Sequence, residues 1–299
     1  MTTRGSDGRA VVVGDALIDE VHSAGGTSEL VGGAALNVAV GLAILGVPTT
    51  LVAMIGEDDD GRDIRSYLEA NGVELVATVS PLGTARAVSH RVNGEPTYSF
   101  NRAARERSID FDERVRGVID DATLVLVSSF PFDDAAAALG LASAIPRPAS
   151  QLIIDANPRQ GMLNDRDAFR QGFERAAITS RLAKIGDEDA ALLYESDVRS
   201  VAAGLIARGA STVFATEGRL GASILTSGGS VLTRPPADLP GEVIDTMGAG
   251  DATLASMAFS ILGMSPDPTD DDWLQALDLA MLRAAATVRT LGATLQTGS

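Results

Sequence analysis

The stretch that decides the fold is Asp245-Thr246-Met247-Gly248-Ala249-Gly250-Asp251, which runs into an apolar segment, Ala252–Leu262. Its glycines let the backbone turn tightly and bring N–H groups close to a ligand. The helix predicted after them adds unpaired N–H groups and the positive end of its dipole. Together these features predict an anion hole suited to phosphate. We expect the carboxylate of Asp251, at the start of the helix, to be kept ionised.

That carboxylate would repel a phosphate unless a hydroxyl group lay between them. Asp251 is therefore predicted to accept the proton of an alcohol that attacks a γ-phosphate, while the backbone N–H groups of Gly248, Ala249, Gly250 and Asp251 stabilise the transferring charge. The fragment alone is also compatible with an ordinary helix N-cap after a glycine turn. The chain has no GxxxxGK[ST] motif, and Thr253 replaces the last glycine of GxGxxG, which excludes a Walker-type site and a dinucleotide fingerprint.

Upstream of this stretch, apolar β-like runs alternate with helical patterns. This alternation predicts an α/β fold with a central, mostly parallel sheet covered by helices on both faces, in one domain over residues 1–299. The predicted strands are Ala10–Val13, Thr50–Ile55, Thr123–Ser128, Gln151–Asp155, Leu182–Ile185 and Thr212–Thr216, with a hairpin over Ala222–Arg234. The predicted helices are Ala34–Leu45, Asp58–Ala70, Asp133–Ala144, Asp165–Ala176, Asp187–Arg208 with a break near Ser196, Asp251–Leu262 and Asp271–Thr290.

One segment breaks the alternation. Thr84–Val92 and Glu95–Phe100 are β-like and flank Asn93-Gly94, the strongest two-residue hairpin signal. An antiparallel hairpin does not belong in a parallel sheet, so we expect a small accessory sheet that acts as a lid, with further strands from Leu17–Leu30. The lid segments are predicted at about residues 16–31 and 84–102.

Composition excludes several classes of protein. The net charge of −16 argues against nucleic acid or an anionic membrane as a partner. There is no cysteine, and only His22 and His90 could supply imidazole, which excludes thiolate chemistry and a multi-histidine metal site. No secretory address or spanning segment is visible, so we expect a cytoplasmic protein.

Two signatures in the right order resemble the ribokinase-like (PfkB) carbohydrate kinases, and the resemblance runs from about Val11 to Gly292. DTMGAGD is similar to the family's C-terminal signature, and Gly32–Ala39 continuing to Gly46, with Gly56-Glu57-Asp58 and Gly61, resembles the N-terminal one. The resemblance implies a ribokinase-like fold with a small β-sheet lid and ATP with Mg²⁺ as donor. It also implies that Asp251 is the catalytic base and that Gly248, Ala249 and Gly250 form the anion hole.

On the acceptor side, Gly14–Asp19 resembles the first strand of fructokinase-like members. The resemblance implies that Asp19, Gly33 and Asn37 bind sugar hydroxyls, as suits carboxylate and amide groups. Asp155-Ala156-Asn157-Pro158-Arg159 resembles the D-x-N-x-R segment of fructokinases and ketodeoxygluconate kinases, which puts Asn157 and Arg159 against the sugar or phosphate. A solvent-facing Asp19, an Asn37 that caps a buried helix and an Arg159 that is a lone surface cation remain alternatives.

On the donor side, Thr216-Glu217-Gly218-Arg219-Leu220-Gly221 resembles the family's nucleotide turn, which implies that Thr216, Gly218 and Gly221 approach ATP, with Lys184 before them. A β-turn between two strands is the alternative. The family's K-x-N-x-x-E is here Lys184-Ile185-Gly186-Asp187-Glu188-Asp189, so Gly186 replaces Asn and Asp189 replaces the glutamate of the magnesium shell. A monovalent-cation site, with potassium as the candidate ion, is implied near Asp245.

The sequence therefore predicts an ATP-dependent sugar kinase that phosphorylates a primary hydroxyl, with fructose favoured by the GDALID and DANPR segments. Ketodeoxygluconate and ribose are the alternative acceptors. A non-catalytic sugar-sensing protein on the same fold is the alternative from another class, and a dehydrogenase is disfavoured by the missing fingerprint. A homodimer formed through the lid strands is a further expectation.

Overall fold

The computed structural model describes residues 8–23, 26–92, 95–145 and 152–298. Within them, nine strands form the larger sheet in the order β13-β12-β11-β10-β9-β8-β1-β4-β5. The strands from β11 to β5 in that order pair in parallel, whereas β12 pairs antiparallel with both β11 and the edge strand β13. These strands are β1 Ala10–Gly14, β4 Thr49–Ile55, β5 Val73–Val79, β8 Leu124–Ser128, β9 Leu152–Asp155, β10 Leu182–Gly186, β11 Thr212–Thr216, β12 Ala222–Thr226 and β13 Val231–Arg234.

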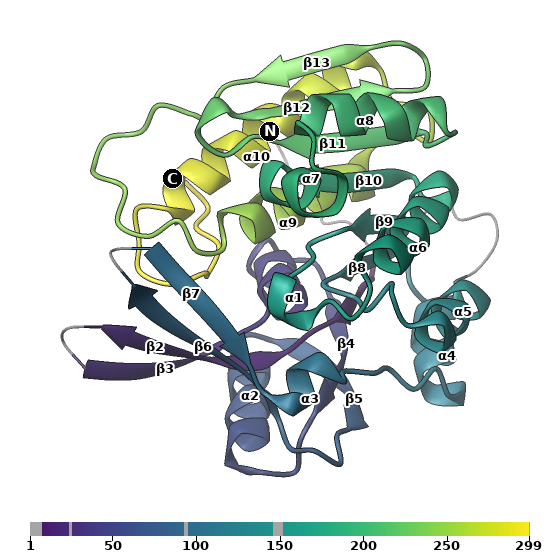
Figure 1. Cartoon of the computed structure of the whole chain (residues 1–299). Helices are drawn as coiled ribbons and strands as arrows, with labels where there is room; N and C mark the ends of the chain where they lie inside the picture. Colours follow the sequence, from purple (N-terminus) through teal and green to yellow (C-terminus); the bar gives the residue numbers. More distant parts are fainter. Residues whose placement is uncertain (1–7, 24–25, 93–94, 146–151, 299) are drawn as a thin grey trace.

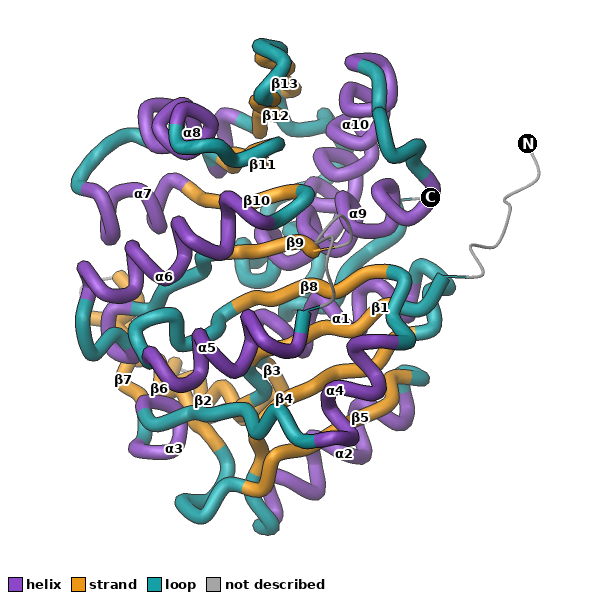
Figure 2. Tube along the Cα trace, turned by 90° about the vertical axis from the view of Figure 1, so that its right-hand side faces the viewer, coloured by secondary structure: helices purple, strands orange, loops and turns teal. Residues whose placement is uncertain are grey.

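Helices cover both faces of this sheet (Figures 1 and 2). Alternate residues of β1 point to opposite sides: Ala10 and Val12 join one buried cluster, and Val11 and Val13 join the other. This explains why the central strands are apolar at every position. The first cluster is completed by α1 Ala34–Ile44, α2 Asp59–Ala70, α9 Ala249–Gly263 and α10 Asp270–Thr287. The second is completed by α4 Glu113–Asp120, α5 Ala135–Ala144, α6 Arg166–Thr179, α7 Asp187–Tyr194 and α8 Val198–Ala207.

A smaller, separate sheet has the order β3-β2-β6-β7 and extends to one side of the molecule (Figure 1). Its outer pairs are antiparallel, whereas β2 and β6 run parallel. The predicted accessory sheet and its contributing segments are thus confirmed, while Asn93-Gly94 lies outside the described residues. Its strands are β2 Leu17–Ser23, β3 Gly26–Gly32, β6 Ala85–Val92 and β7 Glu95–Phe100.

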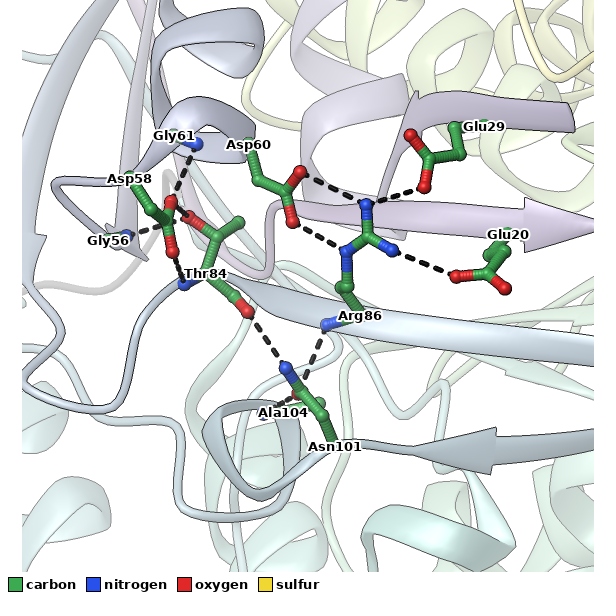
Figure 3. A network of polar contacts seen from close by, with 10 residues as sticks. All are labelled: Glu20, Glu29, Gly56, Asp58, Asp60, Gly61, Thr84, Arg86, Asn101 and Ala104. Carbon is green, nitrogen blue, oxygen red and sulfur yellow. Dashed lines mark hydrogen bonds and ion pairs between the residues drawn. The ribbon is translucent and has the colours of Figure 1, made fainter.

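Arg86 of β6 ties the smaller sheet to the main body (Figure 3). Its guanidinium donates to Asp60 in the first turn of α2 at 2.5 Å, and to Glu20 of β2 and Glu29 of β3 at 2.8 and 2.7 Å. The Arg86 guanidinium therefore joins β2 and β3 of the smaller sheet to α2, one of the helices that cover the larger sheet. The carboxylates of Asp60 and Glu29 raise the pKa of Arg86 further above its usual value, with the hydrogen bond to Asp60 contributing most.

Asp58 fixes the start of β6 (Figure 3). Its carboxylate caps α2 through Gly61 N at 2.9 Å and accepts from Thr84 N and Oγ1 at 2.8 and 2.5 Å. Burial alone would raise the pKa of Asp58, but the hydrogen bonds from Thr84 and Gly61 lower it below its usual value. The Gly56-Glu57-Asp58 segment of the sequence signature thus anchors the segment that leads into the smaller sheet.

One strand and two helices were not predicted: the edge strand β5 Val73–Val79, the short helix α3 Arg102–Arg105 and the helix α4 Glu113–Asp120. The break expected near Ser196 is confirmed, because α7 ends at Tyr194 and α8 begins at Val198. No helix in the described ranges has both the length and the apolar character that crossing a bilayer demands.

Candidate active site

The loop before α9 has a backbone that only glycine accommodates. Gly248 is the N-cap with φ 76°, and a Cβ there would lie 2.5 Å from Ala293 Cα. The helix begins at Ala249 and places Gly250 and Asp251 in its first turn. Since the first N–H groups of a helix have no acceptor within it, this end of α9 can receive an anion beside the Asp251 carboxylate.

The position of Asp251 is set by the packing of α9 on α1. Asn37 of α1 donates a hydrogen bond from Nδ2 to Asp251 Oδ2 at 2.8 Å. One helical turn further along both helices, a Cβ on Gly41 would lie 2.9 Å from Ala255 Cβ. This close approach brings the two polar side chains together across an otherwise apolar contact, and no ion pair of Asp251 occurs among the described residues.

The electrostatics of Asp251 correct one expectation. The helix N-terminus was expected to keep this carboxylate ionised, but burial raises the pKa of Asp251 to about 7. The hydrogen bond from Asn37 and the charges of Arg159 and Lys184 lower this pKa, whereas the charge of Asp155 raises it. Near neutral pH the carboxyl group is therefore poised to take up or release a proton, as general-base catalysis requires.

Asp19 lies against Gly32 in the smaller sheet, and Gly33 lies against the backbone of Asp15 and Ala16. Burial, and next the charge of Asp15, raise the pKa of Asp19 to about 6, while Arg159 lowers it. Gly33 has φ 112°, and a Cβ there would lie 2.9 Å from Asp15 O. Gly32 leaves room for the carboxylate, because a Cβ at that position would lie 2.2 Å from Asp19 Oδ2.

The end of β9 carries Asn157 and Arg159. Asn157 is buried and has a left-handed backbone, with φ 33°. Arg159 is exposed, and no hydrogen bond or ion pair engages its guanidinium in the part of the chain that the structure describes. Desolvation alone would lower the pKa of Arg159. The nearby carboxylates raise it above its usual value, and those of Asp251 and Asp189 have the largest effect. Arg159 is thus close enough to both Asp251 and Asp189 for their charges to act on it.

Beneath these groups lies a buried polar network. Lys184 Nζ, on β10, pairs with Asp155 Oδ1 of β9 at 2.8 Å, and Ser128 Oγ of β8 donates to Asp155 Oδ2 at 2.8 Å. Asn157 Nδ2 reaches Ser128 Oγ at 3.5 Å. Burial alone would lower the pKa of Lys184, but Asp155 and Asp189 raise it. Lys184 is therefore already paired within the protein, which the sequence did not indicate.

Asp189 occupies the first turn of α7. Its Oδ2 accepts from Gly186 N at 2.8 Å, and burial raises the pKa of Asp189 to about 6, although Lys184 lowers it. A Cβ on Gly186 would lie 3.3 Å from both Asp189 Oδ2 and Thr216 Oγ1. A side chain at Gly186 would therefore be crowded between the ends of β10 and β11.

The predicted nucleotide turn begins as β11 ends at Thr216 and contains a short 3₁₀ turn, Gly218–Leu220. Gly218 and Gly221 both have positive φ, 49° and 99°, and a Cβ on Gly221 would lie 2.0 Å from Arg234 O. The turn therefore joins β11 to β12, the first strand of the hairpin. The alternative interpretation of this segment, a β-turn between two strands, requires the same connection.

Asp245 holds the loop before α9. Its carboxylate accepts from Met247 N at 3.0 Å and from Gly292 N at 3.2 Å. Among the described residues, no cluster of three or more His, Cys, Asp or Glu side chains could hold a metal ion alone.

Sequence reasoning missed three groups next to these residues: Asp15, Arg107 and Ser129. Asp15 is 8% exposed, and its Oδ1 accepts from Ala35 N at 3.0 Å. Asp15 and Ser129 follow strands at their carboxyl ends, where open parallel sheets bind ligands, so this rule could have singled them out. Arg107 belongs to no recognisable motif.

Comparison with known proteins agrees with this geometry. The sequence profile of the pfkB family carbohydrate kinases matches residues 9–297. The chain belongs to the PfkB family. It is therefore an ATP-dependent sugar kinase with a ribokinase-like fold, and the family implies use of a divalent metal.

Individual PfkB relatives differ in their acceptors. A fructokinase of Rhizobium leguminosarum bv. trifolii is 30% identical over 83% of this chain and 78% of its own length. An ATP-dependent ribose-1-phosphate kinase of Halopiger xanaduensis is 30% identical over 88% of this chain and 81% of its own. The structure of fructokinase from Vibrio cholerae O395 with fructose, ADP and calcium superimposes with a TM-score of 0.81, at 20% identity, over 96% of this chain and 95% of that one.

Proposed function

We propose that this PfkB kinase transfers the γ-phosphate of ATP to a primary hydroxyl of fructose. The observation that carries the proposal is the Asp251 carboxyl, which lies at the open N-terminus of α9 and is held by Asn37. Fructose as the acceptor is supported by the GDALID and DANPR segments and by the similarity to a fructokinase. Ketodeoxygluconate and ribose are the alternative acceptors.

In this proposal Asp251 accepts the proton of the attacking hydroxyl, because its pKa of about 7 makes it a competent base at neutral pH. The backbone N–H groups of Gly248, Ala249, Gly250 and Asp251 stabilise charge on the transferring group. Asp19, Gly33, Asn37 and Asn157 bind and orient the sugar hydroxyls. Arg159, which faces Asp251 and Asp189, contacts the phosphate that passes between them.

The donor binds at the ends of β10 and β11, against Thr216, Gly218 and Gly221. Lys184 acts there through its buried pair with Asp155. Bound Mg²⁺ neutralises phosphate charge, and Asp189 holds its water shell. Asp245 belongs to a potassium site at the loop before α9, where it also fixes the backbone of Met247 and Gly292.

We further propose that the whole chain is one domain working in the cytoplasm and that the smaller sheet is its lid. Arg86 and Asp58 give this lid a fixed base, so closure over the sugar takes place in the strands beyond them. A homodimer that pairs the lid strands of two copies would protect their edges.

Turnover of ATP over a panel of sugars tests the proposal, with Asp251→Asn beside the natural protein. The variant should lose about 10² to 10⁴-fold in rate, the range for a positioned general base. A best rate that stays within about tenfold would remove Asp251 from this role. Sugar binding by calorimetry without ATP consumption on any acceptor would favour the sugar-sensing alternative instead.

A further inference from the structure

The ion pair between Arg86 and Asp60 ties the smaller sheet to α2, and we call this pair the brace. Arg86 Nε and Nη2 donate to the two carboxylate oxygens of Asp60 at 2.5 and 3.1 Å (Figure 3). Such a two-point contact fixes direction as well as distance. The same guanidinium also donates to Glu20 on β2 and Glu29 on β3, so the brace holds two strands at once.

The brace is shielded from water more than its neighbour on the same helical turn. The side chains of Arg86 and Asp60 are 26% and 24% exposed, whereas those of the adjacent pair, Arg62 and Asp59, are 66% and 89% exposed. Fully exposed ion pairs contribute little, because water screens them and their side chains move freely. The brace therefore has the geometry to hold an element in place, and the adjacent pair does not.

Asp19 lies on the opposite face of the strands that the brace holds. Successive side chains of a strand point to opposite faces, so Asp19 faces away from its neighbour Glu20. The register agrees, because Arg86 pairs with Ile18 and Asp19 pairs with Ala87. Arg86 and Glu20 thus share the face that meets α2, and Asp19 belongs to the other face.

That other face meets the larger layer at the candidate active site. Ala87, the register partner of Asp19, belongs to a buried cluster with Met162, which closes the turn after Arg159. The charges of Asp15 and Arg159 act on the Asp19 carboxyl, so both groups are near it. The base of β2 is therefore held between α2 on one face and the proposed acceptor groups on the other.

The brace reaches Asp19 through a single neighbouring residue. Arg86 Nη1 donates to Glu20 Oε2 at 2.8 Å, and Glu20 adjoins Asp19 on β2. Asp58, in contrast, fixes the backbone at Thr84, just before β6. The position of β2 relative to α2 therefore depends on the brace in addition to the apolar contacts of the strand.

Resting on the proposed sugar-kinase function, we propose that Arg86 and Asp60 are positioning residues for acceptor binding. By holding β2 against α2, they keep the Asp19 carboxyl in its binding position beside Asp15 and Arg159 before the sugar arrives. Preorganisation of this kind strengthens binding, because the sugar does not have to order the group itself. The brace lies on the face away from Asp19, so it acts on the KM for the sugar and not on the KM for ATP.

The test replaces Asp60, because replacement of Arg86 would leave three carboxylates without their shared cation. Asp60→Ala cuts the tie to α2 and keeps the contacts of Arg86 with β2 and β3. We expect the KM for D-fructose, or for the best sugar of the panel, to rise about fivefold, the upper range for one ion pair. The kcat and the KM for ATP should change less than about twofold. Asp60→Glu keeps the carboxylate and should restore most of the loss.

Two matched variants separate the brace from other effects. Asp59→Ala removes the adjacent acid from the same turn of α2, and Glu29→Ala removes a contact of Arg86 within the smaller sheet. Each should change the KM for the sugar by less than about twofold. A rise in either control equal to that in Asp60→Ala overturns the inference, because the tie to α2 would then not be its cause.

Hydrogen exchange of backbone amides detects the brace independently of turnover. Peptides from β2 and the first half of β6 should exchange faster in Asp60→Ala than in Asp59→Ala, because these strands lose their tie to α2. Equal exchange in the two variants, or an unaltered sugar KM in Asp60→Ala, overturns the inference and leaves the sugar kinase intact. Failure of the natural protein to phosphorylate any sugar of the panel refutes the proposed function itself.

Discussion

The hydrogen bond from Asn37 to Asp251 should set the pH at which the enzyme becomes active. Asn37 Nδ2 donates to the carboxylate at 2.8 Å and so favours its ionised form. Replacement of Asn37 by Ala removes this donor, and the pKa of Asp251, which is about 7 in the natural protein, should rise. The base must be ionised to accept a proton, so activity is lost as the pH falls through this pKa.

The size of the effect follows from the bond that is removed. A hydrogen bond to a charged group contributes about 1.5–3 kcal/mol. Because Asp251 is only half-buried and water can replace part of the lost donor, we take the lower end of that range. One pH unit corresponds to about 1.4 kcal/mol. The acidic limb should therefore move upward by about one pH unit.

The assay is kcat/KM for the sugar against pH, since this quantity reports ionisation of the essential base in the free enzyme. Asn37 is also proposed to contact the sugar, so the height of the profile should fall as well. The position of the limb separates the two effects, because a lost sugar contact lowers the curve at every pH. An acidic limb that stays in place in Asn37→Ala would refute the assignment of this limb to Asp251.

Three further predictions follow from single contacts. Gly248→Ala should destabilise the loop and abolish activity, because its Cβ would lie 2.5 Å from Ala293 Cα, and melting and turnover measurements check both effects. Lys184→Met should leave Asp155 as an unpaired buried charge and lower the free energy of unfolding by about 3–5 kcal/mol. Denaturant unfolding measures this loss, and a loss below about 1 kcal/mol would contradict the prediction. Asp251→Asn should raise the melting temperature at pH 8 but not at pH 4. The raised pKa of Asp251 means that the folded protein binds the proton of this carboxyl more tightly than the unfolded chain does. The stability of the natural protein therefore falls as the pH rises from about 4 through 7. An equal difference in melting temperature between the variant and the natural protein at both pH values would contradict this prediction.

The elements with strong local signals could be predicted from the sequence. The helix Ala34–Ile44 differs from its prediction by one residue, since Gly46 has positive φ just after it. The edge strand Val73–Val79 was missed because it is a short run directly after a helix stop at Asn71-Gly72, and only Val73 and Val76 in it are buried. Its place depends on pairing with β4, which is a tertiary property.

The sequence singled out the residues of the candidate site, but it did not predict their electrostatics. A local argument from the helix dipole gives an ionised Asp251, yet the dipole effect is worth at most about 1–2 kcal/mol. Burial between α1 and α9 outweighs it, and burial is known only once the helices are packed. The same holds for Lys184, whose partner Asp155 lies on a neighbouring strand rather than nearby in sequence.

The crossing of α1 and α9 explains why the two signatures of the sequence lie so far apart and still act together. Asn37 and Gly41 are separated by one helical turn, and so are Asp251 and Ala255. The small residues of each pair allow the helices to approach, and that approach places the amide within reach of the carboxylate. A larger side chain at Gly41 would separate the helices at this point and lengthen the Asn37–Asp251 contact. The ionisation of Asp251, the proposed base, therefore depends on Gly41, because the distance between the two helices sets the contact of Asp251 with Asn37.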